Sequence, residues 1–219
     1  DVFTIHGGND MSETILVTGA SAGFGQAICR RLVADGYRVI GSARRIDKLQ
    51  ALQEELGEAF YPLQMDVTDL SQVDHALASL PKAWEKVDVL VNNAGLALGL
   101  APAYEAEVAD WLTMIQTNIV GLTYLTRKIL PQMVERNDGY IINLGSTAGT
   151  VPYPGANVYG ASKAFVKQFS LNLRADLAGK KIRVSNIEPG LCEGTEFSSV
   201  RFKGDEKRVE ALYRDAHAI

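Results

Sequence analysis

The sequence contains few cysteines and histidines and no long apolar run, and each of these absences excludes a class of protein. Its two cysteines, Cys29 and Cys192, lie too far apart in sequence to form a metal or redox pair, which favours a reduced, cytoplasmic setting. The three histidines, His6, His75 and His217, are equally scattered, so no metal site is expected. No run approaches the ~18 consecutive apolar residues of a membrane span, so no membrane partner is expected.

Clusters of basic residues are also absent. The net charge is -4 and no arginine-rich face is visible, which argues against nucleic acid as the main partner. A length of 219 residues with 47% hydrophobic side chains suits one α/β domain with a sizeable core. We expect a single domain over residues 11–219, with residues 1–10 as extension sequence outside it.

Short apolar runs alternate with segments of helical spacing along the whole chain. This alternation predicts a Rossmann-type doubly wound parallel sheet with helices on both faces. Ligands of such sheets bind at the carboxyl ends of the strands. The expected strands are residues 14–17, 37–42, 60–65, 87–91, 140–144 and 182–187, and the expected helices are 26–35, 46–56, 69–79, 111–134, 157–177 and 206–216.

A glycine turn follows the first expected strand. Residues 18–25 read Thr-Gly-Ala-Ser-Ala-Gly-Phe-Gly, a spacing that departs from the G-x-G-x-x-G fingerprint of dinucleotide sites. The physical argument still holds, because glycine lets the backbone approach a diphosphate closely and the start of the next helix favours an anion. We therefore predict a nucleotide site at this turn.

Two arginines, Arg44 and Arg45, follow the second expected strand, and no acidic residue stands there. In a dinucleotide fold this position faces the adenosine ribose, where an acid suits a free 2′-hydroxyl and an arginine suits a 2′-phosphate. The planar guanidinium binds phosphate in a bidentate manner. The two arginines therefore predict NADP(H) as the cofactor. The alternative is that they belong to a solvated basic turn.

The expected helix at residues 157–177 carries Tyr159 and Lys163 one turn apart. A nearby ammonium favours a phenolate and lowers the phenol pKa, so the pair can exchange a proton near neutral pH. Ser146 stands thirteen residues before Tyr159, after an expected strand, where its hydroxyl can join the pair around one carbonyl carbon. Tyr124 and Lys128 have the same spacing but read as an ordinary helix face.

Six motifs follow one another along the chain: Thr18-Gly19-x-x-x-Gly23-x-Gly25, Asn92-Asn93-Ala94-Gly95, Asn118, Ser146, Tyr159-x-x-x-Lys163 and Pro189-Gly190. Together they resemble those of the short-chain dehydrogenase/reductase family, over about residues 14–197. Three stretches, 93–99, 142–149 and 194–204, most resemble the bacterial NADP-dependent 3-hydroxy acid dehydrogenases. The resemblance implies an NADP(H)-dependent enzyme that acts on serine, L-allo-threonine and related hydroxy acids or on malonic semialdehyde.

The resemblance also implies a role for each catalytic position. Tyr159 would be the acid/base, and Ser146 would bind the substrate oxygen. Lys163 would lower the tyrosine pKa and hold the nicotinamide ribose, while Asn118 would support a water that relays protons. Cofactor contacts would come from Gly19, Ala20, Ser21, Ala22, Gly23 and Phe24 for the diphosphate, Arg44 and Arg45 for the 2′-phosphate, Asp66 and Val67 for the adenine, and Asn93 for a ribose. Residues 189–197 would line the nicotinamide and the phosphates, with contacts from Pro189, Gly190, Leu191, Cys192 and Thr195.

Members of this family usually form homotetramers through the helices that correspond to residues 111–134 and 159–178. They also continue with a further helix and a last parallel strand, whereas this sequence ends at Ile219. We therefore expect a C-terminally incomplete domain whose sheet lacks that strand.

The nature of the substrate is the most open point. A carboxylate beside the nicotinamide needs a cation to offset its desolvation, and we expect Arg201 to supply it, with the apolar segment 96–101 as a wall. The alternative for Arg201 is a solvated loop position. Alternative functions are reduction of a neutral ketone, a 3-oxoacyl thioester or a larger carbonyl, or a non-enzymatic role as an NADPH-binding regulator.

Overall fold

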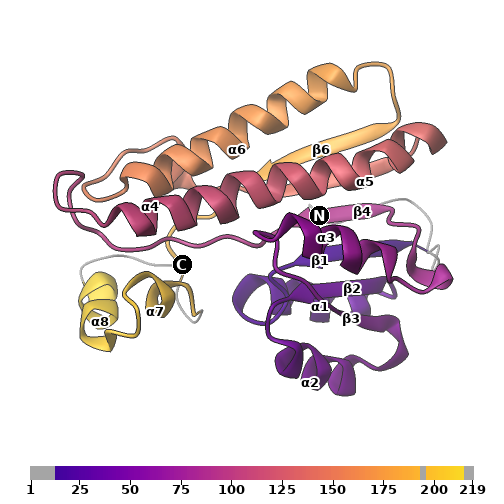
Figure 1. The fold of residues 1–219 in the computed structure, drawn as a ribbon, viewed down its shortest axis with the longest axis horizontal. Coiled ribbons are helices and arrows are strands. Elements are labelled where there is room, and N and C mark those ends of the chain that lie inside the picture. Colours follow the sequence, from indigo (N-terminus) through magenta and orange to yellow (C-terminus); the bar gives the residue numbers. More distant parts are fainter. Residues whose placement is uncertain (1–12, 193–195, 215–219) are drawn as a thin grey trace.

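The computed structural model describes residues 13–192 and 196–214. Its centre is a sheet of six parallel strands in the order β3-β2-β1-β4-β5-β6 (Figure 1). The prediction of a doubly wound parallel sheet is therefore confirmed. The strands are β1 (Thr14–Thr18), β2 (Arg38–Ala43), β3 (Phe60–Gln64), β4 (Val89–Asn92), β5 (Gly139–Leu144) and β6 (Ile182–Ile187).

The sheet is buried on both faces because its strands place apolar side chains alternately on each side. In β1, Leu16 belongs to one apolar cluster, whereas Ile15 and Val17 belong to another. Residues of α3, α5 and α6 join the first cluster, and those of α1 and α2 join the second. The helices are α1 (Gly23–Ala34), α2 (Ile46–Leu56), α3 (Leu70–Ala78), α4 (Val108–Ile115), α5 (Leu122–Arg136), α6 (Asn157–Asp176), α7 (Phe197–Arg201) and α8 (Glu206–Arg214).

Two helical segments differ from the sequence-based expectation. The long helix expected over 111–134 extends from Val108 to Arg136 and is interrupted by a π-helix, η3, at Gln116–Gly121, which contains Asn118. Such widened turns often occur at functional sites. The five-residue helix α7 lies in a stretch expected to be a loop, because so short a helix shows no periodicity.

The strand order reverses between β1 and β4, which lie side by side in the sheet. Their carboxyl ends lead into the glycine turn and into Asn93, so segments more than seventy residues apart in sequence meet at this point. A crevice at such a switch point is where doubly wound sheets bind ligands. Helices α7 and α8 lie beyond this edge of the sheet (Figure 1). Within the described ranges, no helix combines the length and apolar character needed to cross a membrane.

Candidate active site

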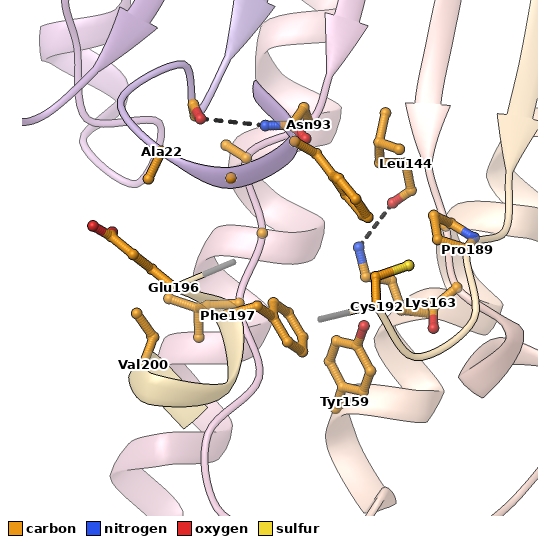
Figure 2. Close-up of a pocket in the computed structure, with 18 of the residues that line it drawn as sticks. Ala22, Asn93, Leu144, Tyr159, Lys163, Pro189, Cys192, Glu196, Phe197 and Val200 are labelled. Carbon is orange, nitrogen blue, oxygen red and sulfur yellow. Dashed lines mark hydrogen bonds between the residues drawn. The ribbon is translucent and has the colours of Figure 1, made fainter. Parts of the chain in front are cut away.

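A cavity of about 240 Å³ opens at the carboxyl edge of the sheet (Figure 2). It receives side chains from both halves of the chain, and Tyr159 and Lys163 reach it from α6. The sequence-predicted glycine turn, catalytic serine and Tyr/Lys pair thus share one cavity. The lining consists of Gly19, residues 21–24, Arg45, residues 93–96, residues 144–146, Tyr159, Lys163, residues 189–192, Glu196, Phe197 and Val200.

The glycine turn is tight enough to exclude any larger residue at two positions. A Cβ on Gly19, whose φ is +68°, would stand 2.9 Å from Asn93 Nδ2, and one on Gly25 would stand 2.1 Å from the Gly19 carbonyl oxygen. Asn93 Nδ2 in turn donates to the carbonyl oxygen of Thr18 at 2.8 Å. Helix α1 begins here without a side-chain cap from Ala22. Its first N–H groups are therefore available to an anion beside the cavity.

The two arginines after β2 have different surroundings. Arg45 lines the cavity, and its guanidinium donates to Ser21 Oγ at 3.1 Å and to Glu196 Oε2 at 2.8 Å. The side chain of Arg44 is exposed and, among the described residues, makes no hydrogen bond or ion pair. Arg44 lies outside the cavity lining. One of the two predicted phosphate ligands is thus already bound to protein oxygens.

Lys163 is buried beneath the cavity, where its Nζ donates to the carbonyl oxygen of Leu144 at 2.8 Å (Figure 2). Burial lowers the pKa of this ammonium to about 8. Its Nζ stands 5.9 Å from the centroid of the Tyr159 ring. The side chain therefore has an ammonium that exchanges its proton at mildly alkaline pH.

Tyr159 is also buried, with 7% of its surface exposed. Burial raises the pKa of its phenol, whereas the hydrogen bond with Ser146 and the charge of Arg201 act in the opposite direction. The sequence suggested that Lys163 would lower this pKa, whereas burial in the fold raises it above the ordinary value of a phenol. The physical reason is that desolvation penalises the phenolate more than the surrounding charges favour it. The structure thus gives a phenol that retains its proton.

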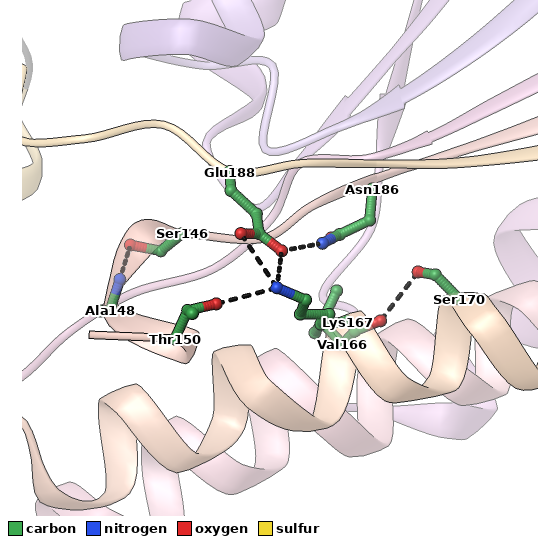
Figure 3. A network of polar contacts seen from close by, with 8 residues as sticks. All are labelled: Ser146, Ala148, Thr150, Val166, Lys167, Ser170, Asn186 and Glu188. Atoms are coloured by element: carbon green, nitrogen blue, oxygen red, sulfur yellow. Dashed lines mark hydrogen bonds and ion pairs between the residues drawn. The ribbon is translucent and has the colours of Figure 1, made fainter. Parts of the chain in front are cut away.

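A polar network fixes the loop that carries Ser146 (Figure 3). Ser146 Oγ accepts from the amide of Ala148 at 3.1 Å. Lys167, one turn beyond Lys163 on α6, donates to Thr150 Oγ1 at 2.9 Å and pairs with Glu188 at 3.2 Å. Because Glu188 directly precedes Pro189, this lysine joins the serine loop and the start of the 189–192 segment to α6.

Asn118 connects the π-helix to the rest of the site. Its Oδ1 accepts from the amide of Leu96 at 2.9 Å, and its Nδ2 donates to the Leu96 carbonyl at 2.9 Å and to Ser162 Oγ at 3.0 Å. Both ends of the side-chain amide therefore bind protein groups, and they join the π-helix to Leu96 and to α6.

Arg201 at the end of α7 is buried, with 5% of its surface exposed. Its Nε donates to the carbonyl of Gly99 at 3.1 Å and its Nη2 to Tyr153 Oη at 3.0 Å. The guanidinium carbon stands 5.6 Å from the centroid of the Tyr159 ring. The expected cation thus lies against the tyrosine and the apolar 96–101 segment, behind the residues that line the cavity.

Several predicted residues lie away from the cavity lining. Ala20 is fully buried and its amide donates to the carbonyl of Ser42 at 3.0 Å. Asp66 accepts from Thr68 at 2.8 Å beyond β3. The remaining predicted positions outside the lining are Val67, Arg44, Asn118 and Arg201, and Thr195 falls outside the described residues.

The wall that faces the cavity at the start of α7 agrees with the expected 189–197 segment at Glu196 and Phe197, and the sequence reasoning missed Val200. Glu196 and Val200 line it, and the Phe197 ring lies 5.8 Å from the Tyr159 ring, at an interplanar angle of 58°. Tyr153, which holds Arg201, carried no sequence signal.

Comparisons with known proteins agree with this geometry. A model of the short chain dehydrogenase family matches residues 13–206. The chain is 60% identical to the NADP-dependent 3-hydroxy acid dehydrogenase YdfG of Salmonella typhi over 94% of its length and 83% of that protein. It is 51% identical to the serine 3-dehydrogenase of Agrobacterium fabrum over 95% of its length and 83% of that protein.

A solved structure is similar over most of the chain. It shows the closed form of a serine dehydrogenase complexed with NADP+, and it matches with a TM-score of 0.91 and 58% sequence identity. The match covers 93% of this chain and 82% of that one.

Proposed function

Because this chain belongs to the short-chain dehydrogenase family, we propose that it is an NADP(H)-dependent oxidoreductase acting on short 3-hydroxy acids. Its substrates would be of the serine, L-allo-threonine or 3-hydroxypropionate type, with malonic semialdehyde in the reverse direction. The observation that carries this proposal is the convergence of Ser146, Tyr159 and Lys163 on one cavity with the glycine turn and Arg45.

The residues at the adenosine and diphosphate side fit the cofactor. The turn at Gly19 leaves no room for a side chain, and the uncapped start of α1 presents N–H groups where a diphosphate would lie. Arg44 and Arg45 would hold the 2′-phosphate, and Asp66 and Val67 would face the adenine. When bound, the nicotinamide supplies a hydride to the substrate carbonyl carbon or accepts one from the carbinol carbon.

The proton chemistry belongs to Tyr159 and Ser146. In reduction, the Tyr159 phenol gives its proton to the substrate oxygen as the carbonyl becomes an alkoxide, and Ser146 donates a hydrogen bond to the same oxygen. A phenol whose pKa is raised by burial retains that proton at neutral pH. In oxidation the proton moves in the opposite direction: Tyr159 takes the proton from the substrate hydroxyl after its own proton has left toward Lys163.

Lys163 and Asn118 would restore the proton on Tyr159. A Cβ placed on Gly95 would stand 3.3 Å from both Lys163 Nζ and Asn118 Oδ1, so the lysine and the asparagine approach each other beside this glycine. A water supported by Asn118 would connect the buried lysine to solvent. Lys163 would also contact the nicotinamide ribose.

The substrate carboxylate would pair with Arg201. This guanidinium is buried beside Tyr159 and is already oriented by Gly99 and Tyr153. We expect Arg201→Gln to raise the KM for a 3-hydroxy acid at least about tenfold and to leave that for an uncharged alcohol unchanged. Lys203→Gln is the matched control, because Lys203 pairs with Asp110 at 2.9 Å. Equal effects on both substrates would instead indicate a structural role for Arg201.

The reaction is tested with a substrate panel. NADP+ reduction is measured with serine, L-allo-threonine, 3-hydroxypropionate and 1,3-propanediol, and NADPH oxidation with malonic semialdehyde and a 3-oxoacyl thioester. We expect kcat/KM to be at least about tenfold higher for the acids than for the neutral compounds. A preference for neutral substrates would indicate instead a reductase of neutral ketones or 3-oxoacyl thioesters. NADPH binding without any turnover would indicate a non-enzymatic, NADPH-binding regulator.

The assembly we propose is a homotetramer in the cytoplasm. An exposed apolar stripe runs along α4 through Val108, Leu112 and Ile115, and Phe165 and Leu171 are exposed on α6. Patches of this kind on neighbouring helices support subunit association. Leu112→Glu should reduce the mass measured by sedimentation equilibrium. Cys29 and Cys192 are both free thiols, in keeping with a reducing compartment, and cell fractionation would test the location.

A further inference from the structure

A carboxylate is bound to one of the two proposed phosphate ligands. Glu196 Oε2 lies 2.8 Å from Arg45 Nη2, although the two residues are separated by 151 positions in sequence. Both line the cavity, and the Glu196 carboxylate is directed toward the side of Ala22, away from Tyr159 (Figure 2). The acid is thus placed at the nucleotide end of the site.

Ser21 completes this cluster. Its Oγ lies 3.3 Å from Arg45 Nε and 3.1 Å from Arg45 Nη2, so the guanidinium faces a hydroxyl of the glycine turn and the Glu196 carboxylate together. The guanidinium thus has two oxygen acceptors on its Nε and Nη2 side, and one of them is anionic. A phosphate binds a guanidinium through a similar arrangement of oxygens. Glu196 therefore occupies a donor of Arg45 Nη2 that a phosphate would use.

A phosphate and the Glu196 carboxylate cannot both bind Arg45 without cost. A phosphate monoester carries about -1.5 to -2 charges near pH 7, and a like charge within a few Å is unfavourable for both groups. Arg44 does not face this conflict, because its side chain is exposed and has no partner among the described residues.

We infer that Glu196 is a specificity-determining residue that competes with the 2′-phosphate for Arg45. This inference depends on the NADP(H) site proposed above and adds an internal competitor to it. The carboxylate weakens binding of the phosphorylated cofactor and aids its release. It leaves binding of the unphosphorylated cofactor unchanged, because that molecule makes no contact that needs the guanidinium.

The competition can be measured by equilibrium binding. Dissociation constants for NADPH and NADH are obtained by fluorescence titration of the wild type and Glu196→Gln at low and high salt. Because the pair is exposed, removing the charge should tighten NADPH binding by about threefold to tenfold at low salt, with a smaller change at high salt. NADH binding should not change. Weaker or unchanged NADPH binding, or an equal change for NADH, would overturn the inference.

Glu55→Gln is the matched control. Glu55 pairs with Arg30 at 2.6 Å and its side chain is 47% exposed, compared with 53% for Glu196, but Glu55 lies outside the cavity lining. The Glu55→Gln substitution removes one negative charge, as Glu196→Gln does, and it should alter neither the NADPH nor the NADH dissociation constant. In an Arg45→Ala background, Glu196→Gln should no longer tighten NADPH binding, and persistent tightening would show that the carboxylate acts without the arginine.

The two proposals fail in different ways. If the wild type binds NADPH and NADH equally and Arg45→Ala changes neither constant, the NADP(H) site is wrong and the competition is wrong with it. If the wild type prefers NADPH and Arg45→Ala removes much of that preference while Glu196→Gln has no effect, the inference about Glu196 fails alone.

Discussion

The chain contains two Tyr-x-x-x-Lys pairs on helices, and their surroundings are opposite. On α5, Tyr124 Oη donates to Asp74 at 2.9 Å and Lys128 Nζ pairs with the same carboxylate at 2.7 Å. The Lys128 side chain is 39% exposed, and the hydrogen bond with Asp74 raises the pKa of its ammonium. This pair is a surface network between α5 and α3.

On α6, no carboxylate is among the groups that shift the pKa values of Tyr159 and Lys163. Tyr159 and Lys163 are both buried, and burial lowers the pKa of Lys163 to about 8 while it raises that of Tyr159. Spacing alone therefore does not create a reactive pair. Desolvation distinguishes this pair, because it lowers the pKa of the ammonium and raises that of the phenol, so the lysine becomes the stronger acid of the two.

The largest expected difference concerns the two phenols. Tyr159→Phe should lower kcat by about 10²–10⁴-fold, because it removes the proton donor used in the transition state. NADPH affinity should stay within a few-fold. Tyr124→Phe should leave kcat unchanged, since it removes only a hydrogen bond to Asp74. Steady-state kinetics of both variants test this, and a Tyr159→Phe enzyme with a tenth of wild-type kcat would disprove the assignment.

The two lysines should differ next most strongly. Lys163→Met should lower kcat/KM about a hundredfold and weaken NADPH binding, since it removes both a ribose contact and the proton reservoir. Lys128→Met should change neither quantity, because its exposed contacts lie on the α3 side of α5. If both variants lost activity equally, loss of packing rather than chemistry would explain the result.

The smallest effect is on stability, and replacing the two lysines should change it in opposite directions. The folded-state pKa of Lys163 is depressed to about 8, so its buried charge destabilises the fold below that pH, and the cost disappears as the pH rises from about 8 toward 10.5. Lys163→Met should therefore raise the free energy of unfolding at pH 7 by about 1–3 kcal/mol. Thermal unfolding at pH 7 and pH 10 measures this, and the gain should be smaller at pH 10.

Lys128 gives the reverse case. Its folded-state pKa is raised above 10.5 by Asp74, so its contribution is fully present below pH 10.5 and is lost as the pH rises through the folded-state pKa. Lys128→Met should slightly lower the melting temperature at pH 7, and the loss should disappear at strongly alkaline pH. A shift of the same sign as that of Lys163→Met would show that both changes act through hydrophobicity alone.

Local patterns were sufficient to predict much of this molecule. Helix α2 runs over Ile46–Leu56, and strand β6 over Ile182–Ile187, as their periodicity indicates. The glycine turn and the pair on α6 were also visible, because each motif lies within a few residues. Their meeting at one cavity follows from the parallel order of the strands.

Other features depend on contacts that no local pattern contains. The pKa of Tyr159 rises because of burial by segments far away in sequence, and the sequence suggested the opposite direction. The bond between Arg45 and Glu196 joins segments 151 residues apart. The π-helix around Asn118 arises inside a continuous helical pattern, so periodicity could place the asparagine but not the widened turn.

The central claim, that burial separates the two pairs, is tested most directly by titrating both lysines. The side-chain ¹³C resonances of lysine-labelled protein are followed by NMR from pH 6 to pH 11, and Lys163→Met and Lys128→Met assign the two signals by removing one each. We predict that Lys163 titrates at a pH of about 8 and Lys128 above 10.5. Titration of Lys163 at or above 10.5 would contradict the account.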